Sequence, residues 1–489
     1  MSCLVWWSLK IVEGACKIFH LFHEAYMSRF PVSSELNKIA KSIASSKGRG
    51  ILVGGAVRDH FMEQRISKDL DVEVFGLSMQ ELESVLQEFG NIHAAGKFFG
   101  VLKLKTPTAE YDFSLPRREQ KTGKGHRGFK IITDPAMSFK EAASRRDFTV
   151  NSMGYDLLEN TLLDPFDGIE DIKHKKLRHV GTAFAEDPLR VFRAMQFSAR
   201  LEFKISSQTA KFFRKLDLSE LPRERIFEEF RKLLLKAKRP SIGLKAAKQL
   251  GVLNYFPELK ALIGVRQDPK WHPEGDVWTH TLMVLDEAAR LRIGIEKKDV
   301  VLMFGALCHD FGKPLTTKFL RGRWRSPSHD TDGIAPTLQF LQRLTDDRDL
   351  IKQVTSMVNE HLRPIQLYNE RGRINSGTIR RLALRVRIPD LILLAKADYL
   401  GRNLTEKERE CFEAGDWLLA EAERMNVKDV GPCPLLMGKH LLKLGMSPGP
   451  EMGKILKLAF EKQLNGDLQT NEQAISWAKS NCPDLAGIA

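Results

Sequence analysis

Two aspartates, Asp69 and Asp71, stand two positions apart in the segment SKDLDVEVFG, and their spacing has chemical meaning. In a β-strand, residues i and i+2 project from the same face, so both carboxylates would point the same way. Two like charges held that close are costly unless a divalent cation lies between them. The cation expected here is Mg²⁺, which in pairs serves in-line displacement at phosphorus. A D-x-D pair alone also occurs by chance.

A glycine pair lies shortly before these aspartates. Gly54 and Gly55 follow the apolar segment ILV, and without Cβ atoms their backbone can approach a triphosphate closely. Arg58, one turn into the next helix, could hold phosphate oxygens. An ordinary strand–turn–helix explains a lone glycine pair equally well, but G-G-x-V-R-D followed by D-x-D is far rarer. Neither the dinucleotide-binding pattern G-x-G-x-x-G nor a Walker A motif is present.

The elements that must position these residues are predicted from hydrophobic patterning. Residues 35–46 read as a helix, and 51–57 as a short apolar strand. Segments 71–75 and 100–106 have the β-branched or alternating character of strands, with an amphipathic helix between them. Beyond about residue 185 nearly everything follows a 3.6-residue period. The predicted fold class is α+β, a head with a mixed β-sheet and helices followed by all-α regions.

The charge of the chain favours a polyanionic partner. The 489 residues contain 76 Lys and Arg against 62 Asp and Glu, a net charge of +14. Between 173 and 248 we count 20 basic and 8 acidic residues, so a local excess of 12 sits in one helical stretch. A solvated helical surface would account for an isolated charge run. Here the concentration of charge favours a surface for a phosphate backbone.

Cysteine usage and hydropathy indicate the cellular compartment in which the protein is expected. None of the six cysteines forms a C-x-x-C pair, which argues against a zinc ribbon or a disulfide framework and fits a reducing cytoplasm. No apolar stretch approaches the roughly 20 residues that cross a bilayer, so no membrane association is expected. Residues 1–28 read as an amphipathic extension of unknown role, or as an over-long start with initiation at Met27.

Four segments in order resemble the motifs of class II nucleotidyltransferases, a family that contains the CCA-adding tRNA nucleotidyltransferases and the bacterial poly(A) polymerases. They are GGAVRD…KDLD, EAASRRDFTVNSMGYD, LLDPFDGIEDI and AFAEDPLRVFRAMQFSARL, and the resemblance runs from about 50 to 240. It implies catalytic, metal-binding roles for Asp69 and Asp71. It also implies nucleotide contacts at a further set of positions, Gly54, Gly55, Arg58, Arg146, Asp187, Arg190 and Arg193.

Within that set, Asp187 and Arg190 resemble the protein template that reads the Watson–Crick edge of the incoming base. A carboxylate accepts from an exocyclic amine and a guanidinium donates to a ring nitrogen or carbonyl, so one pair could select both C and A. In isolation, E-D-x-x-R would be an ion pair at a helix N-terminus. Asp112 is either a third metal-site carboxylate or an edge-strand surface charge. The basic, glycine-rich segment 121–130 resembles the family's mobile loop.

A second group of candidate site residues lies around His309 and Asp310. This adjacent His-Asp pair resembles the signature of HD-domain phosphohydrolases. The resemblance implies four metal ligands, His280, His309, Asp310 and Asp398. Imidazoles mixed with carboxylates suit a divalent transition metal better than calcium, and Mg²⁺ is the other candidate. Three further residues are possible members of this site: His329 and His361, where two-metal relatives place extra ligands, and Lys313, which could neutralise a phosphate. A helix-entry hydrogen bond is expected for His272. A degenerate, purely structural domain is the alternative.

These observations define five regions: 1–28, an extension; 29–175, a nucleotidyltransferase head; 176–262, a basic helical region for nucleotide selection and RNA binding; 263–402, an HD phosphohydrolase domain; and 403–489, a helical C-terminal region. An HD domain behind such a head resembles the multifunctional bacterial CCA enzymes. This implies addition of CCA to tRNA from CTP and ATP, with Mg²⁺ at the head and possible hydrolysis of phosphomonoesters or 2′,3′-cyclic phosphodiesters at the HD site.

Three alternatives remain open from sequence. The first is a poly(A) polymerase, or an enzyme that adds only A or only CC. The second is an HD phosphohydrolase whose head only binds RNA, and the third is a non-catalytic RNA-binding protein. The sequence does not indicate an oligomeric state.

Overall fold

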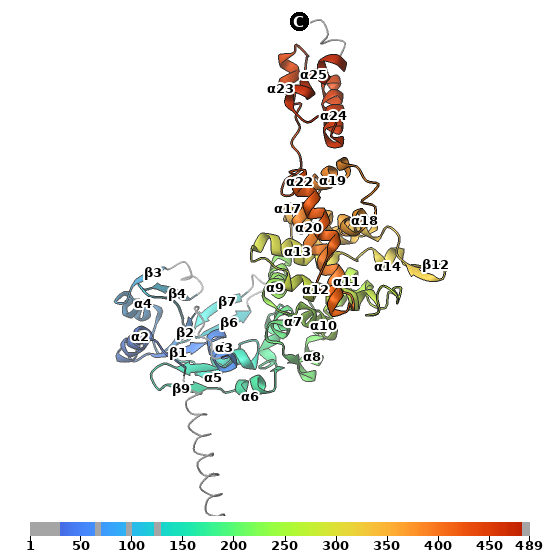
Figure 1. The fold of residues 1–489 in the computed structure, drawn as a ribbon. Coiled ribbons are helices and arrows are strands. Elements are labelled where there is room, and N and C mark those ends of the chain that lie inside the picture. Colours follow the sequence, from blue (N-terminus) through green and yellow to red (C-terminus); the bar gives the residue numbers. More distant parts are fainter. Residues whose placement is uncertain (1–29, 64–69, 94–99, 122–128, 482–489) are drawn as a thin grey trace, which may run out of the picture. The chain divides into compact units, whose positions relative to one another are not determined.

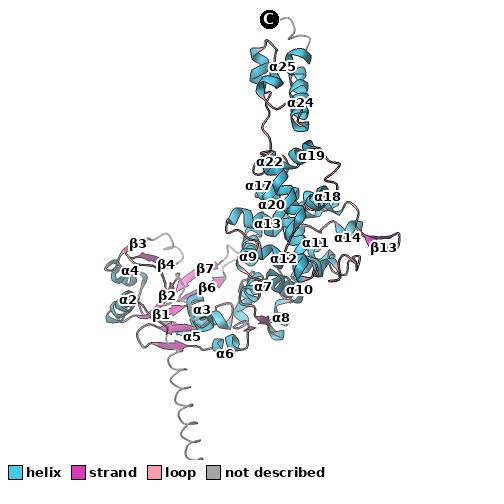
Figure 2. Ribbon diagram, in the orientation of Figure 1, coloured by secondary structure: helices cyan, strands magenta, loops and turns pink. Residues whose placement is uncertain are grey.

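The computed structural model describes residues 30–63, 70–93, 100–121 and 129–481. The chain divides into two compact units, Met1–Leu221 and Pro222–Ala489, and each is described by itself (Figure 1). Figure 2 shows that strands are concentrated in the first unit, whereas the second is almost entirely helical. The predicted α+β class, with a sheet-containing head followed by helices, is confirmed.

A seven-stranded mixed sheet forms the centre of the first unit, in the order β3-β4-β5-β2-β1-β8-β9. Only β2 and β5 run parallel; the other neighbours are antiparallel. The strands are β1 (Arg49–Val53), β2 (Leu70–Phe75), β3 (Asn91–His93), β4 (Val101–Lys105), β5 (Glu110–Ser114), β8 (Gly154–Asp156) and β9 (Thr161–Leu163). The three strands expected near 51–57, 71–75 and 100–106 are therefore present as β1, β2 and β4.

Two amphipathic helices, α2 (Ser34–Ser45) and α4 (Met79–Gln87), pack against this sheet. The Ser33 hydroxyl accepts from the Leu36 N–H at the start of α2, and Ser78 and Glu81 form a reciprocal capping box at the start of α4. The apolar faces of both helices bury their leucines and isoleucines in the main core of the unit. The period and the caps together explain why both helices lie where the sequence predicted them.

The first unit is completed by short helices and two small ribbons. The helices are α3 (Gly55–Glu63), α5 (Phe139–Ser144), α6 (Gly168–Lys173), α7 (Arg190–Leu201) and α8 (Ser207–Phe213). The ribbons pair β6 (Arg117–Lys121) with β7 (Phe129–Thr133), and β10 (Lys176–Leu177) with β11 (Lys204–Ile205). The basic loop expected at 121–130 falls largely on 122–128, outside the described residues.

The second unit is a helical assembly with one two-stranded ribbon. Its helices are α9 (Arg223–Lys236), α10 (Pro240–Leu250), α11 (Pro257–Ala261), α12 (Val277–Arg290), α13 (Glu296–Cys308), α14 (Lys313–Thr316), α15 (His329–Asp332), α16 (Ile334–Gln342), α17 (Arg348–Glu360), α18 (Arg363–Asn369), α19 (Ser376–Ala383), α20 (Ile388–Leu400), α21 (Glu406–Arg409), α22 (Glu413–Arg424), α23 (Gly438–Lys443), α24 (Pro450–Asn465) and α25 (Asn471–Asn481). The ribbon pairs β12 (Lys318–Leu320) with β13 (Arg323–Arg325), and the sequence patterning did not predict it.

Several apolar cores stabilise this unit, a larger one that contains three phenylalanines and smaller ones nearer the C-terminus. Phe230, Phe256 and Phe340 pack edge to face in the larger one, with ring centroids 5.3 to 6.0 Å apart. Helices α23 to α25 enclose a smaller core of their own, which includes Leu441 and Ala474. The C-terminal region is helical as predicted. Among the described residues, no helix is both long and apolar enough to cross a bilayer.

Candidate active site and metal centre

In the first unit, the structure places Asp71 beside the glycine turn that follows β1. Asp71 is the register partner of Val53, and Gly54 comes next with φ +79°, in the left-handed region that favours glycine. A Cβ on Gly54 would lie 3.4 Å from Asp71 Oδ2 and 3.8 Å from Arg146 Nη1. Gly54, Asp71 and Arg146, predicted from three separate segments, therefore meet at one point. Asp69 lies outside the described residues.

A second acidic residue follows Asp71 along β2. Glu73 projects from the same face two residues on, is largely buried, and accepts a hydrogen bond from Arg146 Nη2 at 3.1 Å. The sequence analysis did not single out Glu73. The signal was available, because Asp69, Asp71 and Glu73 continue a single alternation. Glu73 fixes the guanidinium of Arg146 next to the Asp71 carboxylate.

Asp112 lies next to Asp71 in the sheet, since the two are register partners in the parallel pair β2–β5. Its Oδ2 accepts from Lys103 Nζ at 2.9 Å, across the β4–β5 pair. This hydrogen bond, followed by the charges of Asp112 and of neighbouring carboxylates including Asp71, raises the pKa of Lys103. Asp112 therefore adjoins the candidate site and is balanced by a lysine.

Arg58 and Arg193 are joined through two buried side chains. Arg58 Nη1 donates to Asn151 Oδ1 at 2.6 Å, Asn151 Nδ2 donates to Asp147 Oδ1 at 2.9 Å, and Arg193 Nε donates to Asp147 Oδ2 at 2.8 Å. Burial alone would raise the pKa of Asp147, but Arg193 and the hydrogen bonds hold it below its ordinary value. Both guanidinium groups also lie over the Phe197 ring, at 5.3 and 5.2 Å. Two predicted nucleotide contacts thus share one support.

Asp187 and Arg190 flank the start of α7. Arg190 Nη1 donates to the Ala183 carbonyl at 3.0 Å and Nη2 to the Arg145 carbonyl at 2.7 Å. Asp187 Oδ1 accepts from the Leu189 N–H at 3.2 Å. The Arg145 carbonyl belongs to the peptide that leads into Arg146, so Arg190 ties the start of α7 to the segment that reaches Asp71.

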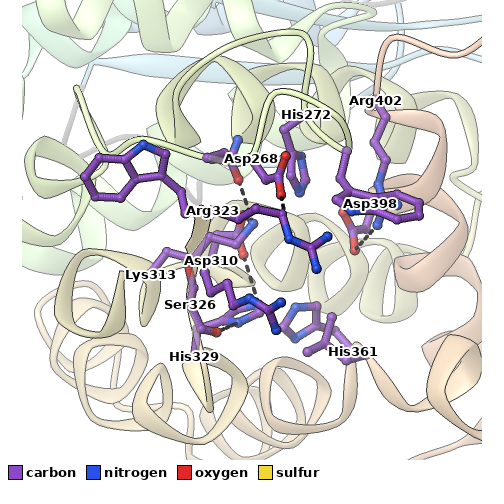
Figure 3. Close-up of a pocket in the computed structure, with 15 residues that line it drawn as sticks. Asp268, His272, Asp310, Lys313, Arg323, Ser326, His329, His361, Asp398 and Arg402 are labelled. Atoms are coloured by element: carbon purple, nitrogen blue, oxygen red, sulfur yellow. Dashed lines mark hydrogen bonds and ion pairs between the residues drawn. The ribbon is translucent and has the colours of Figure 1, made fainter. Parts of the chain in front are cut away.

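In the second unit, the predicted HD residues converge on one cavity of about 350 Å³ (Figure 3). Asp310, His329, His361 and Asp398 line it, and the buried rings of His280 and His309 contact Asp398 and Asp310. The six come from five parts of the second unit. His280 is on α12, His309 and Asp310 follow α13, His329 begins α15, His361 follows α17, and Asp398 is on α20.

Three of the four histidines are oriented in the same way. The Nδ1 atoms of His309, His329 and His361 lie 2.9, 2.8 and 2.6 Å from the carbonyl oxygens of Ala306, Ser326 and Val358, each three residues earlier. A carbonyl can only accept, so each Nδ1 carries a proton, and in the neutral imidazole each Nε2 has a free lone pair. In the described part of the chain, Nε2 of His309 and Nε2 of His361 are among the buried side-chain atoms that have no hydrogen-bond partner.

Asp310 lies between the Nε2 atoms of three histidines. Its Oδ2 lies 3.2 Å from His309 Nε2 and 3.9 Å from His280 Nε2, while its Oδ1 lies 3.5 Å from His329 Nε2. Asp398 Oδ1 lies 3.0 Å from His280 Nε2. Two groups able to hold a metal therefore share Asp310, one with His280 and His309 and one with His329 and His361.

Buried charge at this centre is balanced by neighbours. Burial acts to raise the pKa of Asp310, but the charges of His309 and Lys313 keep it well below its usual range. Burial and the neighbouring imidazoles lower the pKa of His361 to about 4, so its ring is neutral at physiological pH. A neutral imidazole beside an ionised carboxylate is the state in which both bind a metal.

Sequence reasoning missed Glu274. Its Oε1 lies 2.8 Å from Nδ1 of His272 and 2.8 Å from Nδ1 of His280, and its side chain is almost fully buried. The only available signal was a carboxylate six residues before His280. His272 hydrogen-bonds at the entry to α12, as expected, with Glu274 as its side-chain partner, while Asp276 caps the helix.

Lys313 lines the same cavity. Its Nζ lies 2.8 Å from Asp310 Oδ2 and donates to Gln267 Oε1 at 2.8 Å. Its charge is paired with the Asp310 carboxylate. The residues at this centre fit a divalent cation, because buried imidazole nitrogens without hydrogen-bond partners lie around an ionised carboxylate.

Known families match the regions that contain the two sites. Three family models match in order: the "Poly A polymerase head domain" at 51–178, the "Probable RNA and SrmB- binding site of polymerase A" at 202–263, and the "HD domain" at 277–403. The chain is 37% identical over 404 residues to a multifunctional CCA protein of Xylella fastidiosa strain 9a5c, covering 78% of this chain and 92% of the relative. A multifunctional CCA protein of Xanthomonas campestris pv. campestris strain B100 is 36% identical, with 72% and 85% covered.

Solved structures show the same fold at lower identity. The CCA-adding enzyme of Bacillus stearothermophilus in complex with CTP is 19% identical, with a TM-score of 0.60 and 92% and 98% of the two chains covered. The Thermotoga maritima CCA-adding enzyme with bound tRNA is 18% identical, with a TM-score of 0.54 and 92% and 96% covered. With its head, its HD domain and these relatives, the chain belongs to the multifunctional CCA protein family of nucleotidyltransferases.

Proposed function

We propose that this chain adds C, C and A to the 3′ end of tRNA from CTP and ATP without a nucleic-acid template. The observation that carries the proposal is the meeting of Gly54, Asp71 and Arg146 at the end of β1. The glycine turn leaves room for a triphosphate beside a carboxylate, and Arg146, fixed by Glu73, supplies a cation. A structural neighbour, the Thermotoga maritima CCA-adding enzyme, is described in complex with tRNA, which supports tRNA as the acceptor.

In the reaction, the tRNA 3′-hydroxyl oxygen bonds to the α-phosphorus, the bond from that phosphorus to the β-phosphate oxygen breaks, and pyrophosphate leaves. Asp69 and Asp71 would hold Mg²⁺, which when bound offsets charge on the attacking and leaving oxygens. Arg58, Arg146 and Arg193 would bind the triphosphate, with Gly55 giving backbone access. Asp187 and Arg190 would select the base. The basic helical stretch would hold the acceptor stem through its phosphates.

Labelled CTP and ATP, given separately and together, test this on tRNAs that lack CCA or only the last A, and on an unstructured RNA. Ordered C, C, A addition confined to tRNA is expected. ATP tailing of the unstructured RNA would mean a poly(A) polymerase, and addition of A alone would mean a split-specificity enzyme. Asp69→Ala with Asp71→Ala should reduce incorporation by at least about a thousandfold, and survival of incorporation would overturn the mechanism.

A second activity is proposed at the HD cavity, carried by the two groups that share Asp310. His280, His309, Asp310 and Asp398 would hold a divalent transition metal or Mg²⁺, with a second position on His329, His361 and Asp310. Such a centre activates water for attack on a phosphomonoester or 2′,3′-cyclic phosphodiester. His309→Ala is expected to abolish this hydrolysis and spare nucleotide incorporation. Loss of both activities together would show that the HD domain is structural.

A further inference from the structure

One wall of the HD cavity is built from aromatic and basic residues that the Asp310 cluster does not use. Trp271, Arg323, Trp324 and Arg325 line the same cavity as Asp310, His329 and Asp398. Figure 3 shows the Arg323 side chain extending into the pocket between Asp268 and Asp310. Rings on which bases stack, interleaved with cations for phosphates, are the combination that binds single-stranded nucleic acid.

Three wall residues belong to the ribbon β12–β13 and its exit. Phe319 and Trp324 are register partners with ring centroids 5.3 Å apart, and Arg266 lies over the Trp324 ring at 5.5 Å. At the tip, Arg321 and Gly322 both have positive φ, 50° and 74°, as a two-residue hairpin turn with matched twist requires. The ribbon is thus a formed element, although Phe319 keeps 60% of its surface exposed.

The ribbon carries a one-sided charge. Between Asp310 and Asp330 the sequence contains five basic residues, Lys313, Lys318, Arg321, Arg323 and Arg325, and no acidic residue. All but Lys313 are exposed. Arg323 has a loose partner, Asp268, at 4.0 Å. An exposed basic ribbon beside a buried acidic and imidazole cluster is arranged for a substrate whose phosphates continue beyond the reacting one.

The path for such a substrate continues from the cavity over the ribbon. A second hollow of about 650 Å³ is lined by Leu320, Arg321, Arg325, Ser326 and Pro327. Arg325 and Ser326 line both hollows. A chain that enters the cavity with its end at Asp310 can therefore pass Arg325 and reach Arg321 at the tip of the ribbon.

We propose that Trp271 and the ribbon β12–β13 form a binding wall for the last nucleotides of a single-stranded RNA, which presents its terminal phosphate to the Asp310 cluster. This rests on the proposed hydrolase function of the cavity and names its substrate class as an RNA 3′ end rather than a small phosphate ester. Trp271, with 54% of its surface exposed and Lys270 Nζ 5.4 Å from its ring centroid, stacks on the terminal base. Arg325 and Arg321 hold the phosphates behind it.

Two substrates separate this wall from the hydrolytic centre in the full-length chain. One is a four-nucleotide single-stranded RNA ending in a 2′,3′-cyclic phosphate, and the other is glycerol 1,2-cyclic phosphate, which has no base and no second phosphate. Arg321→Ala and Trp271→Ala should each lower kcat/KM for the RNA about tenfold, mainly through KM, and change the glycerol ester less than about twofold. Lys297→Ala, an exposed cation on α13, is the charge-matched control and should leave both unchanged.

Equal losses of kcat/KM on both substrates, or no loss of kcat/KM on the RNA, would overturn the proposal of a binding wall. A higher salt concentration should also weaken the RNA reaction less in Arg321→Ala than in the native chain, because one phosphate contact is gone. The same salt slope in both proteins would count against a phosphate contact at Arg321.

Photo-cross-linking makes the inference independent of the hydrolase proposal. A four-nucleotide RNA with a 3′-terminal 5-iodouridine is irradiated with the full-length chain, and the modified peptides are identified by mass spectrometry. Cross-links at Trp271 or within 318–325, weakened by Arg321→Ala, are expected. If the native chain cross-links there and hydrolyses neither ester, the hydrolase proposal fails and the wall stands. Cross-links confined to other parts of the chain would overturn the wall.

Discussion

The Glu274 carboxylate holds Nδ1 of His280 at 2.8 Å, on the side of the ring that faces away from Asp398. His280 Nε2, the opposite ring nitrogen, lies 3.0 Å from Asp398 Oδ1. Burial acts to lower the pKa of His280, yet its contacts with Asp398 and Glu274 raise it overall. With a proton on Nδ1 held by Glu274, the neutral ring of His280 has its lone pair at Nε2. Glu274 therefore fixes the tautomer in which Nε2 would be the ligand of a cation.

Glu274→Gln is therefore expected to weaken metal binding at the HD centre by about tenfold to a hundredfold. A neutral amide oxygen accepts more weakly from the two imidazoles than the carboxylate does, and the amide NH₂ can oppose the required tautomer. The measurement is a titration of metal-stripped protein with Mn²⁺ or Ni²⁺, read by both calorimetry and phosphoester hydrolysis.

Glu258→Gln is the matched control, since Glu258 is an equally buried carboxylate of the same unit that pairs with Arg343 and no histidine. It should lower stability and leave metal affinity unchanged. Equal metal affinity in the native chain and in Glu274→Gln would show that Glu274 only fills space.

Gly54→Ala is expected to disable nucleotide incorporation by about a hundredfold. The added methyl group would sit 3.4 Å from Asp71 Oδ2, where the triphosphate must approach. It also places alanine at φ +79°, which costs about 1 kcal/mol of stability. Incorporation of labelled CTP into tRNA, with a thermal melt alongside, measures both effects.

Gly264→Ala separates strain from crowding. Gly264 has the same φ of +79°, but a Cβ there would meet nothing within 4 Å. It should show a similar stability loss and normal incorporation. If both variants incorporated nucleotides equally well, the glycine turn would have no part in substrate binding.

How far the sequence predicted this molecule depends on the range of the interactions involved. Asp71 and Gly54 were predicted because strand alternation and a glycine turn are local signals. The sheet brings them together, since Asp71 is the register partner of Val53, the residue before Gly54. The four HD residues were found from the spacing of a known motif. Glu274 was missed because its partner ring lies across a helix entry, a relation that no periodicity encodes.

The ribbon β12–β13 was missed for a different reason. It lies in a region whose surroundings all follow a helical period, and its strands are three residues each. The local pattern KFLRGRWR did carry a signal, with a glycine turn between two aromatic residues that become register partners. Arg58 and Arg193 illustrate a third limit, because their shared support through Asn151 and Asp147 arises only in the tertiary fold.

Asp147→Asn is expected to destabilise the first unit at neutral pH and to have little effect in acid. The folded pKa of Asp147 is lowered, so its ionised form stabilises the fold at pH above its unfolded value of about 4. This contribution is lost as the pH falls through the lower folded pKa. Because Arg193 is one-third exposed, we expect a loss of about 2 kcal/mol at pH 7. Urea unfolding at pH 7, 5 and 3 measures it, and a difference that grows toward pH 3 would contradict the assignment.

His361→Gln is expected to remove one bound metal ion and leave the other. His361 and His329 face Asp310 as one group, whereas His280 and His309 face it as the other. After loading with Mn²⁺ or Co²⁺ and dialysis, elemental analysis should find about one ion fewer per chain in His361→Gln than in the native protein, with hydrolysis reduced. His174→Gln is the control, because His174 is an exposed histidine of the first unit that pairs with Glu170. This variant should retain the native ratio of metal ions per chain. An unchanged ratio in a folded His361→Gln would mean that the cluster holds a single ion on His280, His309, Asp310 and Asp398.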